Sequence, residues 1–288
     1  MSLRRGARIH LLPGRVVALR LDPFILDEMR GRPRALDSHL LEGDLPPIVA
    51  VAEAADREVD LESYVNAYLE EEVRAEALVR DLGPFSRFLE LAAMESGRRI
   101  NVRKLSQQIG VAQSTIAAYY QTLEDCLIIE RIPPLTSGYG RKRLAKTDSF
   151  LFFDLGVRRL AAGEGRRQSP ERLGALFEQF VGLELLRCAR LLPGASRLRC
   201  WRDLNGPEVD WVLEREGRYL PVEAKWTDTP RQRDIRHLKL FVNEYPQADQ
   251  GTLVCRVPRP IQLDHHIQAI PWQAIDQLVL PPAADAAG

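Results

Sequence analysis

Two acidic residues and a lysine near the C-terminal end have residue types and a spacing that could serve phosphate chemistry. Asp210 lies within Glu-Val-Asp-Trp-Val-Leu at positions 208–213, and Glu223 and Lys225 follow in the tripeptide Glu-Ala-Lys. Carboxylate oxygens suit Mg²⁺ or Mn²⁺, and a lysine ammonium is a compact positive charge. Together these side chains could hold a divalent cation against a phosphate.

A β-hairpin is needed to bring the three residues together. Residues 208–214 and 219–226 largely alternate polar and apolar side chains, the pattern of half-buried strands. The short polar segment between them contains a glycine and predicts a tight connection. Pairing Glu214 with Tyr219 then places Asp210 opposite Glu223.

Lys225 is two residues beyond Glu223 and is expected on the same face of this hairpin. Directly opposed carboxylates repel each other, and a bound cation would remove that penalty. From the residues alone, a solvated charged face is an equally good interpretation. The other face is expected to be core, and its members are Val209, Trp211, Leu213, Leu220, Val222, Ala224 and Trp226.

The pattern of Asp210 followed by Glu223-x-Lys225 resembles the motif of the PD-(D/E)xK phosphodiesterase superfamily, which includes restriction enzymes and junction resolvases. In that superfamily a helix carrying another acid precedes the hairpin. Residues 173–187 have apolar residues at helical spacing, and Glu178 takes the position of the helical acid. Glu184 competes for that role, because it falls on the largely apolar side of the same helix.

The resemblance implies a role for each residue of the motif. Asp210 and Glu223 would bind Mg²⁺ or Mn²⁺ together with the carbonyl of Ala224, and Glu178 would hold the metal through a water or keep it in register. Lys225 would orient the attacking water or stabilise the transition state. The resemblance therefore implies a metal-dependent nuclease acting on DNA, whereas a non-catalytic module that couples a target to an ATPase is the alternative.

Further segments extend the resemblance over nearly the whole chain. They are Gly-Arg-Val-Val-Ala-Leu-Arg-Leu-Asp-Pro at 14–23, Tyr-Leu-Glu at 68–70, Phe-Phe-Asp-Leu-Gly at 152–156, Leu-Phe-Glu at 176–178 and Val-Glu-Ala-Lys at 222–225. In this order they are similar to the C-terminal part of a large family of prokaryotic AAA-type ATPases. In that family the ATPase core is followed by a winged helix and a PD-(D/E)xK-like domain of unknown function.

The resemblance implies a multi-domain α+β or α/β protein. The expected parts are a remnant of an ATPase core and a loose connector (1–60), a helical winged-helix domain (61–157), a linker (158–169), a restriction-endonuclease-like domain with a mixed sheet flanked by helices (170–280) and a disordered tail (281–288). No G-x-x-x-x-G-K-[ST] sequence occurs. No ATP binding or hydrolysis is therefore expected from this chain, and an ATPase is a possible partner.

The winged helix is predicted from three helices and a hairpin. A helix begins near Glu62 and runs to residue 78, and the three helices of the domain follow at 85–95, 101–109 and 113–126, with strands at 127–132 and 149–153. Between the two strands lies the densest basic cluster in the chain. Its members Arg141, Lys142, Arg143 and Lys146 are expected to contact DNA phosphates. The alternative is a winged helix that only packs the two domains together.

Composition limits where such binding can occur. Forty Lys and Arg residues balance forty Asp and Glu residues, so no global field draws the protein to DNA. The four cysteines are scattered without a C-x-x-C pair, which favours a reduced, cytoplasmic setting. No apolar run approaches the length of a membrane span. Adjacent residues on a strand point to opposite faces, so His265 and His266 are not expected to bind a metal together.

Overall fold

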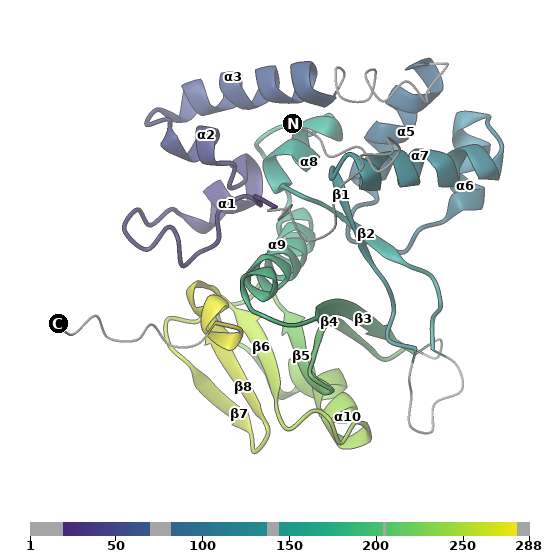
Figure 1. Cartoon of the computed structure of the whole chain (residues 1–288). Coiled ribbons are helices and arrows are strands. Elements are labelled where there is room, and N and C mark those ends of the chain that lie inside the picture. Colours follow the sequence, from purple (N-terminus) through teal and green to yellow (C-terminus); the bar gives the residue numbers. More distant parts are fainter. Residues whose placement is uncertain (1–19, 70–81, 137–143, 204–205, 281–288) are drawn as a thin grey trace, which may run out of the picture.

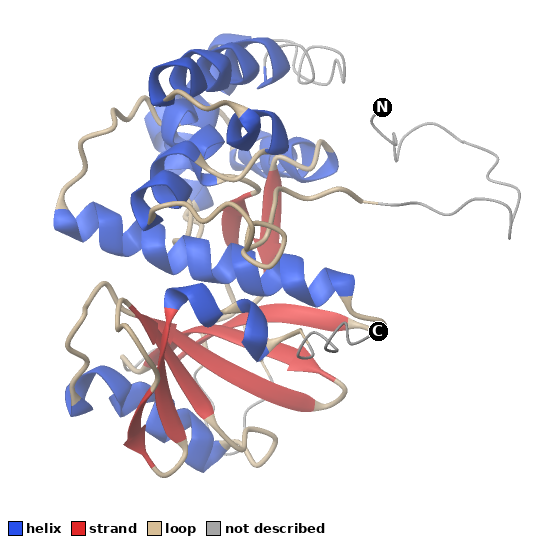
Figure 2. Cartoon of the chain, turned by 90° about the vertical axis from the view of Figure 1, so that its left-hand side faces the viewer, coloured by secondary structure: helices blue, strands red, loops and turns tan. Residues whose placement is uncertain are grey.

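The chain folds as a mixed α+β protein in which one long helix separates a helical half from a sheet. A computed structural model describes residues 20–69, 82–136, 144–203 and 206–280. The long helix, α9 (Pro170–Leu191), has most N-terminal helices on one side and a six-stranded sheet on the other (Figures 1 and 2). Residues 1–19, the predicted helix end at 70–78 and the predicted tail at 281–288 lie outside the described residues.

The N-terminal segment is largely helical, so the prediction of a loose connector at residues 34–60 is wrong. It contains α1 (Leu36–Glu42), α2 (Pro46–Ala50) and the start of α3 (Ala54–Tyr64), which continues as the π-helical turn η1 (Val65–Leu69). The helix predicted from Glu62 thus begins eight residues earlier. These helices are stable because they pack against distant elements rather than because of their own length.

Three buried carboxylates, Glu42, Asp44 and Asp154, join this segment to the rest of the molecule. Glu42 accepts hydrogen bonds from three arginines, Arg34 (2.8 Å), Arg57 (2.8 Å) and Arg166 (2.6 Å). Asp154 Oδ2 accepts from the Asp44 amide (2.8 Å), and Asp154 Oδ1 accepts from the amides of Gly156 and Val157. We call Glu42, Asp44, Asp154 and the arginines around them the buried ion-pair network.

Asp154 is also the N-cap of α8 (Leu155–Ala161), a helix that lies where the sequence predicted the start of a linker. Arg158 and Arg159 are buried in this helix. Arg158 Nε donates to the Ala93 carbonyl (2.6 Å), and Arg159 Nε donates to the Leu41 carbonyl (2.7 Å). The arginine pair is therefore part of the interior, and only the stretch after α8 remains a connection to α9.

The three predicted helices of the next segment are present as α5 (Leu82–Met94), α6 (Val102–Ile109) and α7 (Gln113–Asp125). Asn101 caps α6 by accepting a hydrogen bond from the Lys104 amide (2.9 Å), and Gly110 ends it with a left-handed φ of 82°. Two antiparallel strands follow, β1 (Ile129–Ile132) and β2 (Ser149–Phe152).

The C-terminal sheet has the order β3-β4-β5-β6-β8-β7. β5 and β8 run parallel to β6, whereas the remaining pairs are antiparallel, so the predicted mixed sheet is confirmed. Strands β3, β7 and β8 were not predicted, and His265 and His266, expected on a strand, lie in the turn between β7 and β8. The strands are β3 (Ser196–Arg202), β4 (Glu208–Arg215), β5 (Arg218–Ala224), β6 (Gly251–Cys255), β7 (Ile261–Asp264) and β8 (Ile267–Pro271).

The hairpin of β4 and β5 has the predicted register. Glu214 pairs with Tyr219, and the ladder continues in step to Trp211 and Val222. The turn residues Glu216 and Gly217 have φ values of 51° and 74°, the left-handed pair of a type I′ turn. This turn has the right-handed twist that the two strands need.

Both faces of the hairpin are buried, so the prediction of one core face and one charged face is incorrect. Helix α9 covers one face and contacts Trp211 and Val222, while α10 (Arg236–Glu244), preceded by the 3₁₀ turn η2 (Gln232–Ile235), covers the other face, where Val212 lies. Val209, expected beside Trp211, belongs to the α10 side, and a register shift between β3 and β4 occurs at this point. The charged side chains of the hairpin lie near its two ends, with Glu214, Arg215 and Arg218 at the turn and Asp210 and Glu223 at the opposite end.

Candidate functional site

Asp210 and Glu223 come together at the end of the hairpin that is opposite to the turn. They are the next step after the Trp211–Val222 pair, and the Ala224 amide donates a hydrogen bond to Asp210 Oδ2 at 2.9 Å. The Lys225 amide donates to the Val254 carbonyl of β6 (2.9 Å), and the Lys225 side chain is exposed. The register that the sequence predicted therefore brings the two carboxylates together.

Helix α9 contributes Glu178 to the same place. The indole Nε1 of Trp211 donates a hydrogen bond to the Glu178 carbonyl (2.9 Å), which fixes this turn of the helix against β4. A Cβ atom on Gly182 would lie 2.7 Å from the Trp211 ring, so the absence of a side chain there allows this close packing. Glu178 is thereby held next to Asp210.

Glu184, the other acid considered on this helix, lies in a different environment. Its Oε1 accepts a hydrogen bond from the Leu26 amide at 2.7 Å, and the side chain is 1% exposed. Burial raises the pKa of Glu184 to about 8. Glu184 therefore packs against the N-terminal segment, and Glu178 is the acid beside the hairpin.

The pKa values of the three carboxyl groups are all raised. Burial raises the pKa of Asp210 to about 6, and burial together with the charge of Asp210 raises the pKa of Glu178 to about 8. Burial and Asp210 likewise raise the pKa of Glu223 well above its usual value. Lys225 opposes all three shifts. We call Glu178, Asp210 and Glu223 the acid cluster, which carries less than its full negative charge near neutral pH.

One atom of this cluster lacks a partner. Glu223 is 9% exposed, and its buried Oε2 has no hydrogen-bond partner among the described residues. A buried carboxylate oxygen without a donor is costly, and a cation would relieve that cost. The oxygen donors of Asp210, Glu223 and the Ala224 carbonyl are those that Mg²⁺ or Mn²⁺ accepts.

The acid cluster is not a three-carboxylate metal site as it stands. Within the described part of the chain, no three His, Cys, Asp or Glu side chains are arranged so that they could hold a metal ion. The predicted set differs, because it combines two carboxylates with a backbone carbonyl. The donor types of that smaller set fit a divalent cation.

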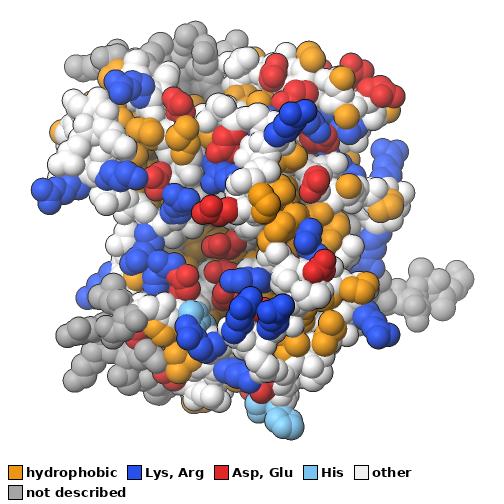
Figure 3. Space-filling model, turned by 180° about the vertical axis from the view of Figure 1, so that it is seen from behind, with side chains coloured by type: hydrophobic (Ala, Val, Ile, Leu, Met, Phe, Trp, Pro, Cys, Tyr) orange, Lys and Arg blue, Asp and Glu red, His pale blue; other side chains and the backbone are white. Residues whose placement is uncertain are grey.

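Part of the acid cluster opens onto a cavity of about 450 Å³ between the helical half and the sheet. Glu178 and Asp210 line it, and so do five basic side chains: Arg98, Arg99, Lys104, Arg172 and Arg202. Figure 3 shows acidic side chains in a recess near the middle of the back face, with lysine and arginine side chains gathered around it. Sequence reasoning missed these basic residues, although the adjacent arginines after Gly97 were a signal for them.

The predicted DNA-binding cluster is largely outside the described residues. Arg141, Lys142 and Arg143 fall in the gap at 137–143. Lys146 is exposed, and its neighbours Ala145 and Thr147 line the cavity. The basic residues that the structure does place at the acid cluster come instead from other elements.

Family comparisons divide the chain at the start of α9. Residues 33–168 match the family described as Domain of unknown function (DUF8612), and residues 173–275 match Domain of unknown function (DUF4143). The second match confirms a C-terminal domain of unknown function where the sequence predicted one. In the described residues, no helix has both the length and the apolar character needed to cross a membrane.

Two mycobacterial proteins are similar to this chain in sequence. The uncharacterized proteins Rv2008c of Mycobacterium tuberculosis and Mb2031c of Mycobacterium bovis are each 28% identical to it over 228 residues, which is 78% of this chain. Those residues make up 50% of each relative. The chain thus spans about half the length of the curated relatives that it matches.

Solved structures show only weak similarity. A half-complex of Thermococcus gammatolerans McrB AAA+ hexamers with bound McrC matches with a TM-score of 0.27 and 13% identity, over 66% of this chain and 46% of that one. Protein VC1899 of Vibrio cholerae matches with a TM-score of 0.24 and 15% identity, over 79% of this chain and 55% of that one. Scores this low do not establish a shared fold.

Proposed function

We propose that this chain is a divalent-metal-dependent phosphodiesterase that acts on DNA. In this proposal the helical half is a winged-helix domain and the C-terminal half is a PD-(D/E)xK nuclease-like domain, working in the cytoplasm as a module of an AAA-type ATPase system. The observation that carries the proposal is the meeting of Asp210, Glu223 and Glu178 beside Lys225, at a cavity with a basic wall.

Each side chain of the site has a role that its position supports. Asp210 and Glu223, with the Ala224 carbonyl, would hold Mg²⁺ or Mn²⁺, and the unsatisfied Glu223 Oε2 is the atom that gains most from it. The bound cation would supply positive charge to the scissile phosphate and make a nearby water more acidic. Lys225, an exposed cation beside the acid cluster, would stabilise the negative charge that develops on the phosphate.

Glu178 would act from the helix side of the site. Burial and the negative charge of Asp210 raise its pKa to about 8. A carboxyl group with a pKa near the working pH can accept a proton from a water or return one to a leaving group. Glu178 would therefore orient a water at the site and supply its third carboxyl group.

A second candidate function is a non-catalytic module that binds nucleic acid or a protein and presents it to an ATPase. The observation that favours it is the lack of a three-side-chain metal site among the described residues. In that case the acid cluster would be a relic whose carboxyl groups stay partly protonated. The two functions differ in whether Asp210 and Lys225 are needed for any chemical step.

Cleavage of DNA tests the first function. Linear, supercoiled and branched DNA are incubated with the protein and Mg²⁺ or Mn²⁺, comparing the wild type with Asp210→Asn and Lys225→Ala. We expect each variant to lose at least about a hundredfold in rate. Asp228→Asn, an exposed acid two residues beyond Trp226, is the matched control and should cut normally. Absence of cutting on every substrate, or equal cutting by the variants, contradicts the proposal.

Calorimetric titration with Mn²⁺ tests the metal site without requiring turnover. The cation must displace protons from the acid cluster, so its apparent affinity should rise as the pH increases from about 6 to about 8. Asp210→Asn should abolish the binding heat, whereas Asp228→Asn should preserve it. Equal binding by the wild type and Asp210→Asn would show that the carboxylates do not hold the ion.

A further inference from the structure

The turn that follows α5 brings two arginines of the helical half to the acid cluster. Arg98 and Arg99 are exposed, and both line the cavity that Glu178 and Asp210 also line. Each of the other basic residues of that wall already has an acidic partner. Lys104 pairs with Glu95 (2.7 Å), Arg172 with Glu164 (2.6 Å) and Arg202 with Glu208.

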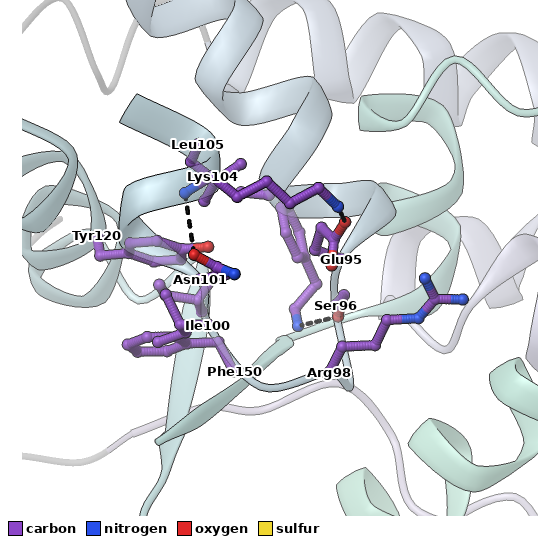
Figure 4. A pocket seen from close by; sticks show the side chains of 12 residues that line it. Glu95, Ser96, Arg98, Ile100, Asn101, Lys104, Leu105, Tyr120 and Phe150 are labelled. Atoms are coloured by element: carbon purple, nitrogen blue, oxygen red, sulfur yellow. Dashed lines mark hydrogen bonds and ion pairs between the residues drawn. The ribbon is translucent and has the colours of Figure 1, made fainter. Parts of the chain in front are cut away.

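Arg98 and Arg99, in contrast, have no ion-pair partner among the described residues. Figure 4 shows the Arg98 side chain extending away from Tyr120 and Phe150, two of the aromatic residues of a small neighbouring pocket. Two cations that face a cavity without local partners are available for an anionic ligand. A nucleic-acid backbone could supply a phosphate to each of them.

The turn is held in place by α9. Ser96 Oγ donates a hydrogen bond to Gln179 Oε1 (2.7 Å), and Gln179 directly follows Glu178 in the chain. Gly97 has a φ of +81°, and a Cβ atom there would lie 2.8 Å from Gln179 Cγ. The Gly97 amide also donates to the Phe150 carbonyl (2.8 Å). These contacts fix the turn against the part of α9 that carries Glu178.

We propose that Arg98 and Arg99 bind the phosphodiester backbone of the nucleic-acid strand that passes through this cavity. The nucleic-acid strand would lie between the helical half and the sheet. The two arginines would contact the phosphates that neighbour the scissile phosphate. This inference rests on the proposed function and extends it, because it assigns substrate binding to the helical half at a place other than the predicted wing. The two arginines are binding residues, and Glu178, Asp210, Glu223 and Lys225 remain the reacting groups.

Binding measured without divalent ions tests this inference separately from cleavage. Fluorescence anisotropy of labelled single-stranded and duplex DNA is recorded in EDTA over a series of salt concentrations. Each phosphate contact contributes roughly 0.7 to 0.9 to the slope of log K against log salt. We expect the double variant Arg98→Ala, Arg99→Ala to lower that slope by roughly 1.4 to 1.8.

The matched control is the double variant Arg197→Ala, Arg218→Ala, which removes the same charge at the turn end of the sheet. Both residues are exposed, and neither lines the cavity. This control should keep the wild-type slope, and thermal melting checks that both variants are folded. Equal slopes for the two double variants, no DNA binding by the wild type, or equal competition by polyglutamate would overturn the inference.

The same data separate the inference from the proposed function. If the slope falls as expected but no DNA is cut with Mn²⁺, the arginines bind nucleic acid and only the nuclease proposal fails. If DNA is cut by the wild type and by Arg98→Ala, Arg99→Ala with equal KM and equal salt dependence, the nuclease proposal stands and the arginine inference fails.

Discussion

Two groups of carboxylates, the ion-pair network and the acid cluster, are held in opposite ways. In the ion-pair network Glu42 has three arginine donors, and Asp154 accepts three backbone amides. In the acid cluster Glu223 Oε2 has no partner among the described residues, and burial with mutual repulsion raises the pKa values. The first arrangement fastens chain segments together, whereas the second leaves a deficit of positive charge that a ligand can supply.

The largest effect is expected from breaking the network at Asp154. Asp154→Ala removes the cap of α8 and leaves the Asp44, Gly156 and Val157 amides without their acceptor. The expected loss in the free energy of unfolding is roughly 3 to 5 kcal/mol, measured by urea denaturation. The surface variant Asp228→Ala should change stability by less than about 0.5 kcal/mol. A loss below about 1 kcal/mol for Asp154→Ala would contradict the structural role given to the network.

A smaller loss in the free energy of unfolding is expected from a substitution in the turn between β4 and β5. This turn positions the acid cluster but not the buried ion-pair network. Gly217 has a φ of +74°, so Gly217→Ala should cost about 1 to 2 kcal/mol in urea denaturation. Gly165→Ala is the matched control, because Gly165 lacks a positive φ and a Cβ atom added there would meet no other atom within 4 Å. Equal effects of the two substitutions would argue against the type I′ turn.

A change of opposite sign is expected within the acid cluster. Asp210→Asn removes one of the repelling charges and keeps an oxygen that can accept from the Ala224 amide. Without divalent ions at pH 8, the variant should be more stable than the wild type by up to about 1 kcal/mol. Thermal or urea unfolding measures this, and a loss of more than about 1 kcal/mol would show that the Asp210 charge is satisfied within the protein.

The smallest effects concern pH, where Glu178 of the acid cluster and Glu42 of the network should respond at opposite ends of the scale. Burial raises the pKa of Glu178 to about 8, so the folded state holds its proton more tightly than the unfolded chain does. This contribution to stability is complete below about pH 4.5 and is lost as the pH rises towards 8. Glu178→Gln should therefore flatten the fall in Tm between those values.

Glu42 gives the contrasting case. Burial raises its pKa, but hydrogen bonds and charges from Arg166 and Arg57 outweigh burial and hold the pKa below its usual value. Its contribution is present above about pH 4.5 and is lost as the pH falls through the lowered pKa. Glu42→Gln should thus flatten the Tm profile on the acid side only. If both substitutions alter the same pH range, Glu42 and Glu178 do not differ in the way described.

The parts of the fold that sequence predicted are those with strong local signals. The hairpin register followed from alternation around Glu216 and Gly217, and α6 was predicted as a short helix that ends at Gly110. The closeness of Asp210 and Glu223 follows from the same hairpin. These features depend on neighbours within about one turn or one strand length.

The missed elements depend on partners far away in the chain. Helix α1 is anchored by Glu42, whose partner Arg166 is 124 residues distant. Strand β3 has the sequence Ser-Arg-Leu-Arg-Cys-Trp-Arg, which looks polar and solvated, yet Trp201 is fully buried against α10. Arg158 and Arg159 looked like linker residues because their buried partners cannot be recognised from spacing. The basic wall of the cavity was missed for the same reason.

The two-residue turn between β4 and β5 has an evolutionary consequence. Successive side chains of a strand point to opposite faces, so inserting or deleting one residue at Glu216 or Gly217 would turn Asp210 and Glu223 away from each other. The acid cluster could then be lost in one mutational step far from any of its own residues. Related chains that keep the acids should therefore keep the length of this turn. Related chains that have lost the acids should be free to vary the turn length.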